Sequence, residues 1–158
     1  MPDDYVFPVD STAILAFAGA LGETNKVYYD ADHATATPVG GVIAPPTFAV
    51  AANQWDADYY LRGVRQIPEP TAAGTANARK PADGPALHAE MRFEYHRPMR
   101  PGMRVSVARR PGATWEKDGR KGGRLKFAET ITEYRDESGA LLVTTRSVSV
   151  TTGRPPTD

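Results

Sequence analysis

Apolar and polar residues alternate in the stretch after Pro85, and this pattern restricts the possible folds more than any other feature of the chain. The apolar members are Leu87, Ala89, Met91, Phe93 and Tyr95, and the polar members are His88, Glu90, Arg92, Glu94 and His96. Because successive side chains of a strand point to opposite faces, the stretch predicts a β-strand with one buried face. The runs at residues 103–107, 125–135 and 141–151 predict three more strands, separated by glycine-containing turns.

Two helices are expected before these strands. The first follows a short extended run at Tyr5–Phe7, and Asp10 or Ser11 caps it by accepting from first-turn N–H groups. Its apolar stripe is formed by Ile14, Phe17 and Leu21. The second helix begins at Pro45 or Pro46, because the N–H that proline lacks has no helical partner in a first turn. Its apolar stripe is longer and is formed by Phe48, Ala52, Trp55 and Tyr59.

The order of these elements predicts an α+β fold in which an antiparallel sheet packs on the second helix. With 158 residues, 41% of them hydrophobic, one domain is expected at residues 1–152. The polar segment at residues 153–158 is expected to be a disordered tail. Residues 61–85 are rich in Pro, Gly, Ala and Thr, which predicts a long loop of the kind that is often functional or mobile.

Composition excludes several classes of function. The formal net charge is +0, whereas a nucleic-acid-binding protein needs a basic excess to neutralise phosphates. Arg104, Arg109 and Arg110 form a local basic group, which is read as a solvated surface or as a landing site for coenzyme A phosphates. Cysteine is absent, so no disulfide or thiol nucleophile is expected. No stretch approaches the roughly 20 apolar residues that span a membrane, and we expect a cytoplasmic protein.

Three segments resemble the MaoC-like N-terminal dehydratase family in their order and spacing. They are residues 22–28 (GETNKVY), residues 41–48 (GVIAPPTF) and residues 93–102 (FEYHRPMRPG). The resemblance implies a single hot-dog domain, in which an antiparallel sheet of about five strands wraps around a long central helix. Members of this family act on acyl thioesters, pair through their sheets and carry their active sites at the dimer interface.

The first segment departs from the catalytic pattern of that family, which reads Gly-Asp-x-Asn-Pro-x-His. Glu23 stands in the place of the Asp, Asn25 matches the Asn, and Tyr28 stands in the place of the His. Histidine titrates near pH 6.5 and tyrosine near pH 10, so Tyr28 is a poor general base at neutral pH. We expect Asn25 to hold the loop through side-chain-to-backbone hydrogen bonds.

The second segment departs as well. The family has Ala-His-Gly at the start of its central helix, where a backbone N–H polarises the thioester carbonyl. Here the triplet is matched by Ala44, Pro45 and Pro46, and a proline has no N–H to donate. The N–H of Thr47 is the possible substitute, helped by the positive helix end. Two catalytic devices are therefore altered together.

Four residues of the second helix are candidates for contact with the acyl group: Thr47, Phe48, Trp55 and Tyr59. For Phe48 and Trp55 the alternative is a place in the ordinary core. His33 either approaches the substrate or lies on the surface. His88 and His96 are separated by about 26 Å along a strand, too far to share a metal. We expect neither a metal nor a cofactor.

Three functions remain open. The first is an acyl-thioester-binding, non-catalytic subunit of a (3R)-hydroxyacyl-CoA or carrier-protein dehydratase. It would form a homodimer in isolation, and a heterodimer with a catalytic hot-dog chain is the alternative in the cell. The second is a self-sufficient homodimeric hydratase or thioesterase that uses Glu23 with Tyr28 or His33. The third is an acyl-CoA binding module without chemistry. For the first two functions, the ligand is an acyl-CoA or an acyl-carrier-protein thioester.

Overall fold

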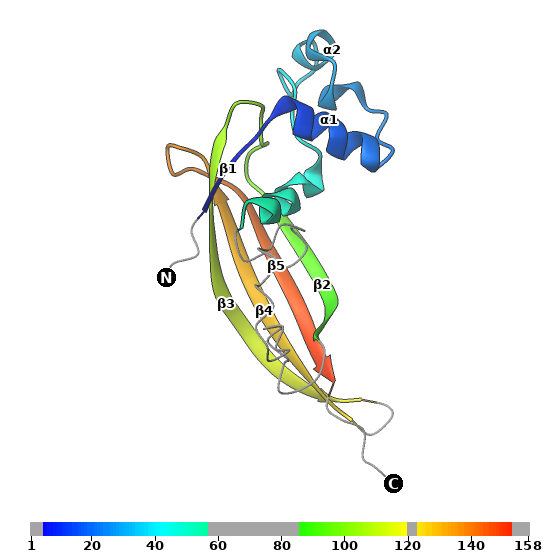
Figure 1. The fold of residues 1–158 in the computed structure, drawn as a ribbon, viewed down its shortest axis with the longest axis vertical. Helices are drawn as coiled ribbons and strands as arrows, with labels where there is room; N and C mark the ends of the chain where they lie inside the picture. Colours follow the sequence, from blue (N-terminus) through cyan, green and yellow to red (C-terminus); the bar gives the residue numbers. More distant parts are fainter. Residues whose placement is uncertain (1–4, 57–85, 120–122, 153–158) are drawn as a thin grey trace, which may run out of the picture. The chain divides into compact units, whose positions relative to one another are not determined.

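A computed structural model describes residues 5–56, 86–119 and 123–152 of the chain. Five strands form one sheet with the order β1-β3-β4-β5-β2 (Figure 1). Their bounds are β1 Tyr5–Pro8, β2 Ala86–Tyr95, β3 Arg104–Asp118, β4 Arg124–Arg135 and β5 Leu141–Thr152. β2, β4 and β5 lie where the sequence predicts strands, whereas β3 continues well beyond the predicted run at residues 103–107. β1 pairs antiparallel with the start of β3, with Tyr5 opposite Val107 and Phe7 opposite Val105.

The described residues divide into two units. The first contains residues 5–56, 93–109 and 132–145, and the second contains residues 86–92, 110–119, 123–131 and 146–152. The first unit holds all the helices and the hydrophobic core, and therefore all the residues that position the site. The second unit is built from strand segments, and its aromatic rings Trp115 and Phe127 stack with centroids 5.2 Å apart.

Short helices precede the central segment of the first unit. α1 spans Ser11–Ala20, and Asp10 caps it by accepting from the N–H groups of Thr12 and Ala13. α2 spans Ala31–Thr35, where the side chain of Asp30 accepts from the N–H of His33. Both caps satisfy first-turn donors, and the cap at Asp10 is one that the sequence predicts. Leu21 is a correction: it is 54% exposed beyond the end of α1 and does not complete the apolar stripe.

The central helix differs from the expected one. η2 spans Pro46–Trp55 and is a 3₁₀-helix rather than a long α-helix. Pro45 and Pro46 supply no N–H, and the bond that closes the first turn runs from Phe48 N to Pro45 O, three residues back. Asp56 N donates to Asn53 O in the same way at the other end. The predicted continuation to Tyr59, the loop at residues 61–85 and the tail at residues 153–158 lie outside the described residues.

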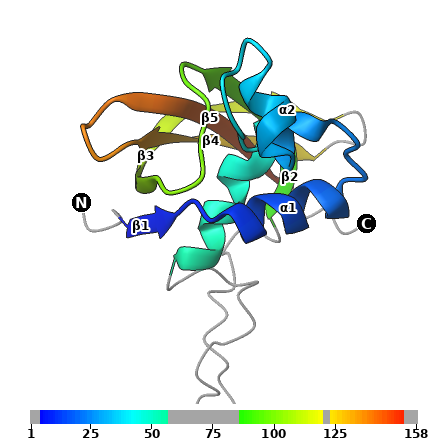
Figure 2. The same ribbon diagram turned by 90° about the horizontal axis from the view of Figure 1, so that it is seen from above.

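The core lies between η2, β1, α1 and the sheet (Figure 2). Phe48 is 1% exposed and its ring meets those of Phe7 and Phe17 at centroid distances of 6.2 Å and 5.4 Å. Aromatic side chains thus fill the space between η2 and the N-terminal elements. The sheet contributes further buried apolar residues: Val105, Val107, Tyr134, Leu142 and Val143.

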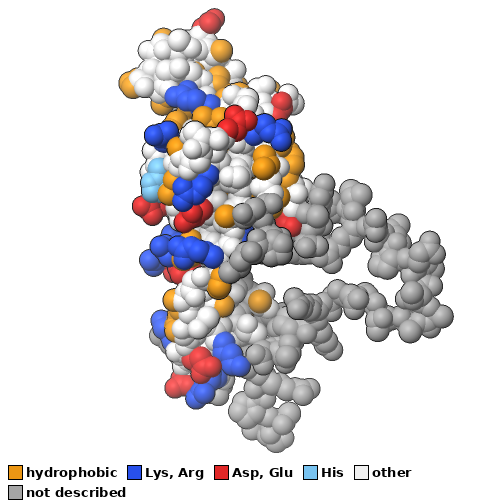
Figure 3. Space-filling view, turned by 90° about the vertical axis from the view of Figure 1, so that its left-hand side faces the viewer, with side chains coloured by type: hydrophobic (Ala, Val, Ile, Leu, Met, Phe, Trp, Pro, Cys, Tyr) orange, Lys and Arg blue, Asp and Glu red, His pale blue; other side chains and the backbone are white. Residues whose placement is uncertain are grey.

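Charges of both signs cover the face drawn in Figure 3, where Lys and Arg side chains lie next to Asp and Glu. This face therefore carries no extended basic patch of the kind that binds nucleic acid. None of the helices in the described part of the chain has the length and apolar character that a bilayer-spanning segment needs. The architecture is the predicted α+β fold with an antiparallel five-stranded sheet.

Candidate functional site

The segment between α1 and α2 carries the residues that stand in the catalytic positions. Gly22 ends α1 with φ at +70°, a conformation that glycine adopts without strain. The chain then turns through η1, the 3₁₀ turn Lys26–Tyr28, and the side chain of Asn25 caps it by accepting from Val27 N at 3.2 Å. The side-chain oxygen of Asn25 therefore accepts a hydrogen bond from the backbone of its own turn.

Tyr28 and Glu23 do not form an acid–base pair suited to neutral pH. Burial raises the pKa of Tyr28 above its ordinary value, and the nearby charge of Glu23 raises it further. Glu23 is exposed, and its carboxylate makes no hydrogen bond or ion pair within the described residues. A phenol with a raised pKa keeps its proton, so Tyr28 can donate a hydrogen bond, and even less of it is in the basic phenolate form at neutral pH than for a free tyrosine.

Backbone hydrogen bonds bring this segment to the start of η2. Ile43 N donates to Val27 O at 3.3 Å, next to Tyr28, and Ala44 N donates to Met99 O at 2.8 Å. The guanidinium of Arg100 donates to the carbonyl of Val39 in the loop between them. Three stretches far apart in the sequence therefore meet at one place, where the family pattern locates its chemistry.

The start of η2 offers one backbone donor. Pro45 and Pro46 have no N–H, and the N–H of Phe48 is used by Pro45 O. The N–H of Thr47 has no acceptor within the described residues, and Thr47 is exposed. An oxyanion site normally presents preorganised donors at about 2.7–3.1 Å from the oxygen, and this helix start retains a single candidate.

A small cavity of about 40 Å³ opens beside this helix start. Its walls come from the entry to η2, from the end of β2 and the turn after it, and from β5: Ala44, Pro45, Pro46, Ala49, Tyr95, Arg97, Pro98, Met99 and Val143. Among the described residues of its wall, Tyr95 and Arg97 are the titratable ones. Both lie in the segment at residues 93–102 that resembles the family, but local composition assigns no binding role to either.

The residues predicted to contact the acyl group lie in different environments. Phe48 is buried in the aromatic core, which is the alternative that the sequence leaves open. Trp55 is 36% exposed and its ring centroid lies 5.6 Å from that of Phe7. Tyr59 is outside the described residues. Thr47 is therefore the one of the four that is exposed at the start of η2.

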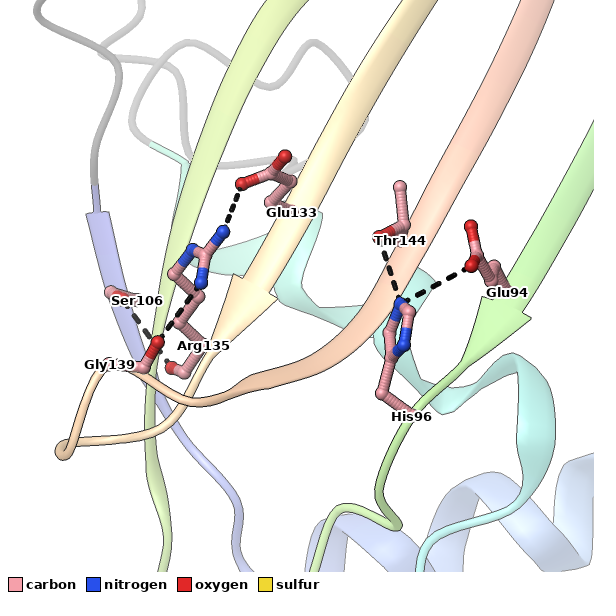
Figure 4. Close-up of polar contacts among 7 residues, drawn as sticks. All are labelled: Glu94, His96, Ser106, Glu133, Arg135, Gly139 and Thr144. Carbon is pink, nitrogen blue, oxygen red and sulfur yellow. Dashed lines mark hydrogen bonds and ion pairs between the residues drawn. The ribbon is translucent and has the colours of Figure 1, made fainter.

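The histidines stay apart from the cavity. His96 approaches Thr144 Oγ1 at 3.4 Å and Glu94 at 3.9 Å through Nε2 (Figure 4). Glu94 alternates along β2 with Phe93 and Tyr95, which stack on the other face of the strand. His33 is exposed in α2 and His88 is exposed in β2. Among the described residues, no three His, Cys, Asp or Glu side chains are grouped so that they could hold a metal ion.

The other end of η2 is fastened to the sheet by Arg109. Its guanidinium pairs with Asp56 and donates to Asn53 Oδ1 at 2.5 Å and to Tyr5 Oη at 3.0 Å. The carbon at the centre of the guanidinium lies 5.4 Å from the centroid of the Tyr5 ring. Burial raises the pKa of Tyr5 to about 12, although Arg109 opposes the shift. Arg109 therefore has a structural role in fastening η2 to the sheet, whereas Arg104 and Arg110 are exposed.

Residues 3–145 match the sequence model of the family described as FAS1-like, dehydratase domain region. The chain is also 31% identical over 143 residues to a probable enoyl-CoA hydratase alpha subunit of Thermomonospora curvata. That match covers 88% of this chain and 43% of the relative, so the chain spans less than half the length of that protein.

Solved structures share the fold. The MaoC-like dehydratase from Rhodospirillum rubrum aligns with a TM-score of 0.65 at 19% identity, over 97% of this chain and 91% of that chain. A chain of the ChsH1–ChsH2 complex from Mycobacterium tuberculosis aligns with a TM-score of 0.69 at 20% identity, over 99% and 86% of the two chains. The predicted hot-dog fold is confirmed by these likenesses.

Proposed function

Because the chain belongs to the FAS1-like dehydratase family of MaoC-like hot-dog proteins, we propose that it is an acyl-thioester-binding, non-catalytic subunit. In this proposal it pairs with a catalytic hot-dog chain, and together they hydrate an enoyl thioester or dehydrate a (3R)-hydroxyacyl thioester. The thioester is carried by coenzyme A or by an acyl carrier protein.

The observation that carries the proposal is the coincidence of two losses at one place. The start of η2 has two prolines where a carbonyl-binding N–H is needed, and the segment next to it presents Tyr28 where a base is needed. Loss of a general base reduces a rate by about 10²–10⁴, and loss of one oxyanion donor by about 10²–10³. Both losses together leave a site that holds a thioester more readily than it transforms one.

Pairing is supported by the sheet. β2 ends the strand order, so one of its edges pairs with no other strand among the described residues. Long unpaired edges invite another strand. The structurally similar ChsH1–ChsH2 complex is an assembly of two different subunits, which is the arrangement proposed for this chain in the cell. In isolation, the same edge would pair two copies of the chain.

The test is co-expression with a hot-dog protein that carries the intact Asp-x-Asn-Pro-x-His pattern. We expect a stable complex by size-exclusion chromatography with light scattering, and hydration of crotonyl-CoA by that complex. Substituting the partner's catalytic Asp should abolish the activity, whereas Glu23→Gln in this chain should leave it unchanged. A complex that keeps its activity without the partner's Asp would overturn the proposal.

One observation favours a second candidate, a self-sufficient homodimeric hydratase or thioesterase. Glu23 lies close enough to Tyr28 for its charge to raise the pKa of the phenol, so the two residues share one site. In this alternative, Glu23→Gln abolishes turnover by the isolated chain without unfolding it. Glu137→Gln is the matched control, because Glu137 is an exposed carboxylate in the β4–β5 turn.

A further inference from the structure

We propose that Arg97, assisted by Tyr95, binds the carbonyl oxygen of the acyl thioester in the cavity at the start of η2. This inference rests on the proposed function and adds to it the chemical group that is bound and the side chains that bind it. It also assigns the cavity to the thioester head rather than to the acyl tail.

The size of the cavity suits the thioester group rather than an acyl tail. A site needs about 10–15 Å³ of such volume for each water-sized group. The volume of about 40 Å³ therefore accommodates about three non-hydrogen atoms, as many as a carbonyl and the carbon next to it. Much of the wall is apolar, formed by Ala44, Ala49, Met99 and Val143, and suits the carbon part.

The charge of the cavity supports an oxygen ligand. Arg97 is the only charged residue in the wall, and its guanidinium makes no hydrogen bond or ion pair within the described residues. Its charge acts on Asp136 only weakly, because the pKa of that carboxyl is lowered mainly by Ser138 and least by Arg97. The guanidinium therefore keeps its donors for a ligand, and hydrogen bonds from a charged donor are about twice as strong as neutral ones.

Backbone hydrogen bonds hold the main chain at Arg97, whereas its guanidinium makes no hydrogen bond within the described residues. His96 N and Arg97 N both donate to Leu142 O, at 2.9 Å and 3.1 Å, and Pro98 follows with its restricted φ. The base of the side chain is thereby held at the cavity wall. Burial raises the pKa of Tyr95, so its hydroxyl remains a donor beside Arg97. The side-chain donors of Tyr95 and Arg97 line the same cavity as Pro45 and Pro46, which have no backbone N–H to donate.

The experiment compares two ligands that differ at the carbonyl. Butyryl-CoA carries the thioester oxygen, whereas the thioether S-butyl-CoA keeps the same four-carbon tail without it, and neither can be hydrated. Isothermal titration of the full-length chain should show tighter binding of butyryl-CoA by about tenfold, the value of one hydrogen bond from a charged donor. Arg97→Gln should remove this preference, Arg97→Lys should retain part of it, and Tyr95→Phe should reduce it.

Arg104→Gln is the matched control, because Arg104 is an exposed arginine in the same unit and does not line the cavity. It should keep the full preference for butyryl-CoA. An Arg97→Gln variant that keeps the preference would overturn this inference and leave the proposed function standing. Equal weakening of both ligands would also overturn it, since Arg97 would then bind a coenzyme A phosphate. Failure of the unaltered chain to bind either ligand would overturn both proposals.

Discussion

Replacing Arg109 by methionine tests whether η2 is held on the sheet by one polar cluster. Methionine keeps much of the apolar stem and removes the guanidinium, which pairs with Asp56 and donates to Asn53 and Tyr5. The side chains of Arg109 and Asp56 are 27% and 18% exposed, so the pair is largely but not fully shielded from water.

The expected loss follows from this partial burial. Breaking a fully buried pair costs about 3–5 kcal/mol, whereas exposed pairs contribute about 0–1 kcal/mol. For Arg109→Met we therefore expect the free energy of unfolding to fall by about 2–4 kcal/mol, a large share of a typical domain's stability. Arg104→Met on the same strand is the control, and as an exposed substitution it should change the free energy by no more than about 0.5 kcal/mol.

Urea unfolding followed by circular dichroism measures both variants. The double variant Arg109→Met with Asp56→Leu should be more stable than the sum of the two single losses predicts, because it leaves no unpaired charge. Hydrogen exchange should accelerate in η2 of the single variant. If Arg109→Met were as stable as the Arg104→Met control, the cluster would not be what fastens η2, and the reasoning would fail.

Three further substitutions probe the frame around the site. Gly41→Ala should destabilise the chain by about 1–3 kcal/mol, because Gly41 has φ at +142° and an added Cβ would lie 3.2 Å from Arg100 Nη1. Asp10→Ala should lower the free energy of unfolding by about 1 kcal/mol through loss of the α1 cap. The stability of the protein should fall as the pH rises from about 10 to 12, because unfolded tyrosine loses its proton before folded Tyr5 does, and Tyr5→Phe should flatten this slope. Chemical unfolding measures all three, and an unchanged pH slope in the Phe variant would contradict the third.

Local patterns in the sequence predict the parts of this fold that depend on near neighbours. The alternation from Leu87 to Tyr95 indicates β2, and Asp10 indicates the start of α1, because each signal acts within a few residues. The 3₁₀ geometry of η2 is not predictable in this way. Its apolar spacing at Phe48, Ala52 and Trp55 is that of an α-helix, and the structural context overrides this local preference.

In the candidate site too, some residues can be identified from the sequence, and others depend on contacts between distant segments. The altered residues Glu23 and Tyr28 are recognisable because a family pattern gives their positions a meaning. Arg97 also lies in a segment that resembles the family, but its proposed role cannot be predicted from that pattern, since it depends on a cavity that also needs Val143 and the start of η2. Arg109 was read as surface because its partner Tyr5 lies 104 residues away. Contacts at such separation leave no trace in local composition.

The most direct test of the account is the rate at which the purified chain alone hydrates crotonyl-CoA, compared with its complex with a catalytic hot-dog subunit at equal concentration. The account predicts a rate for the isolated chain that is below that of the complex by at least about 10²-fold, since the chain has a tyrosine in place of the base and only the N–H of Thr47 as an amide donor. An isolated chain that matched the complex, and that lost its activity on Glu23→Gln, would contradict it.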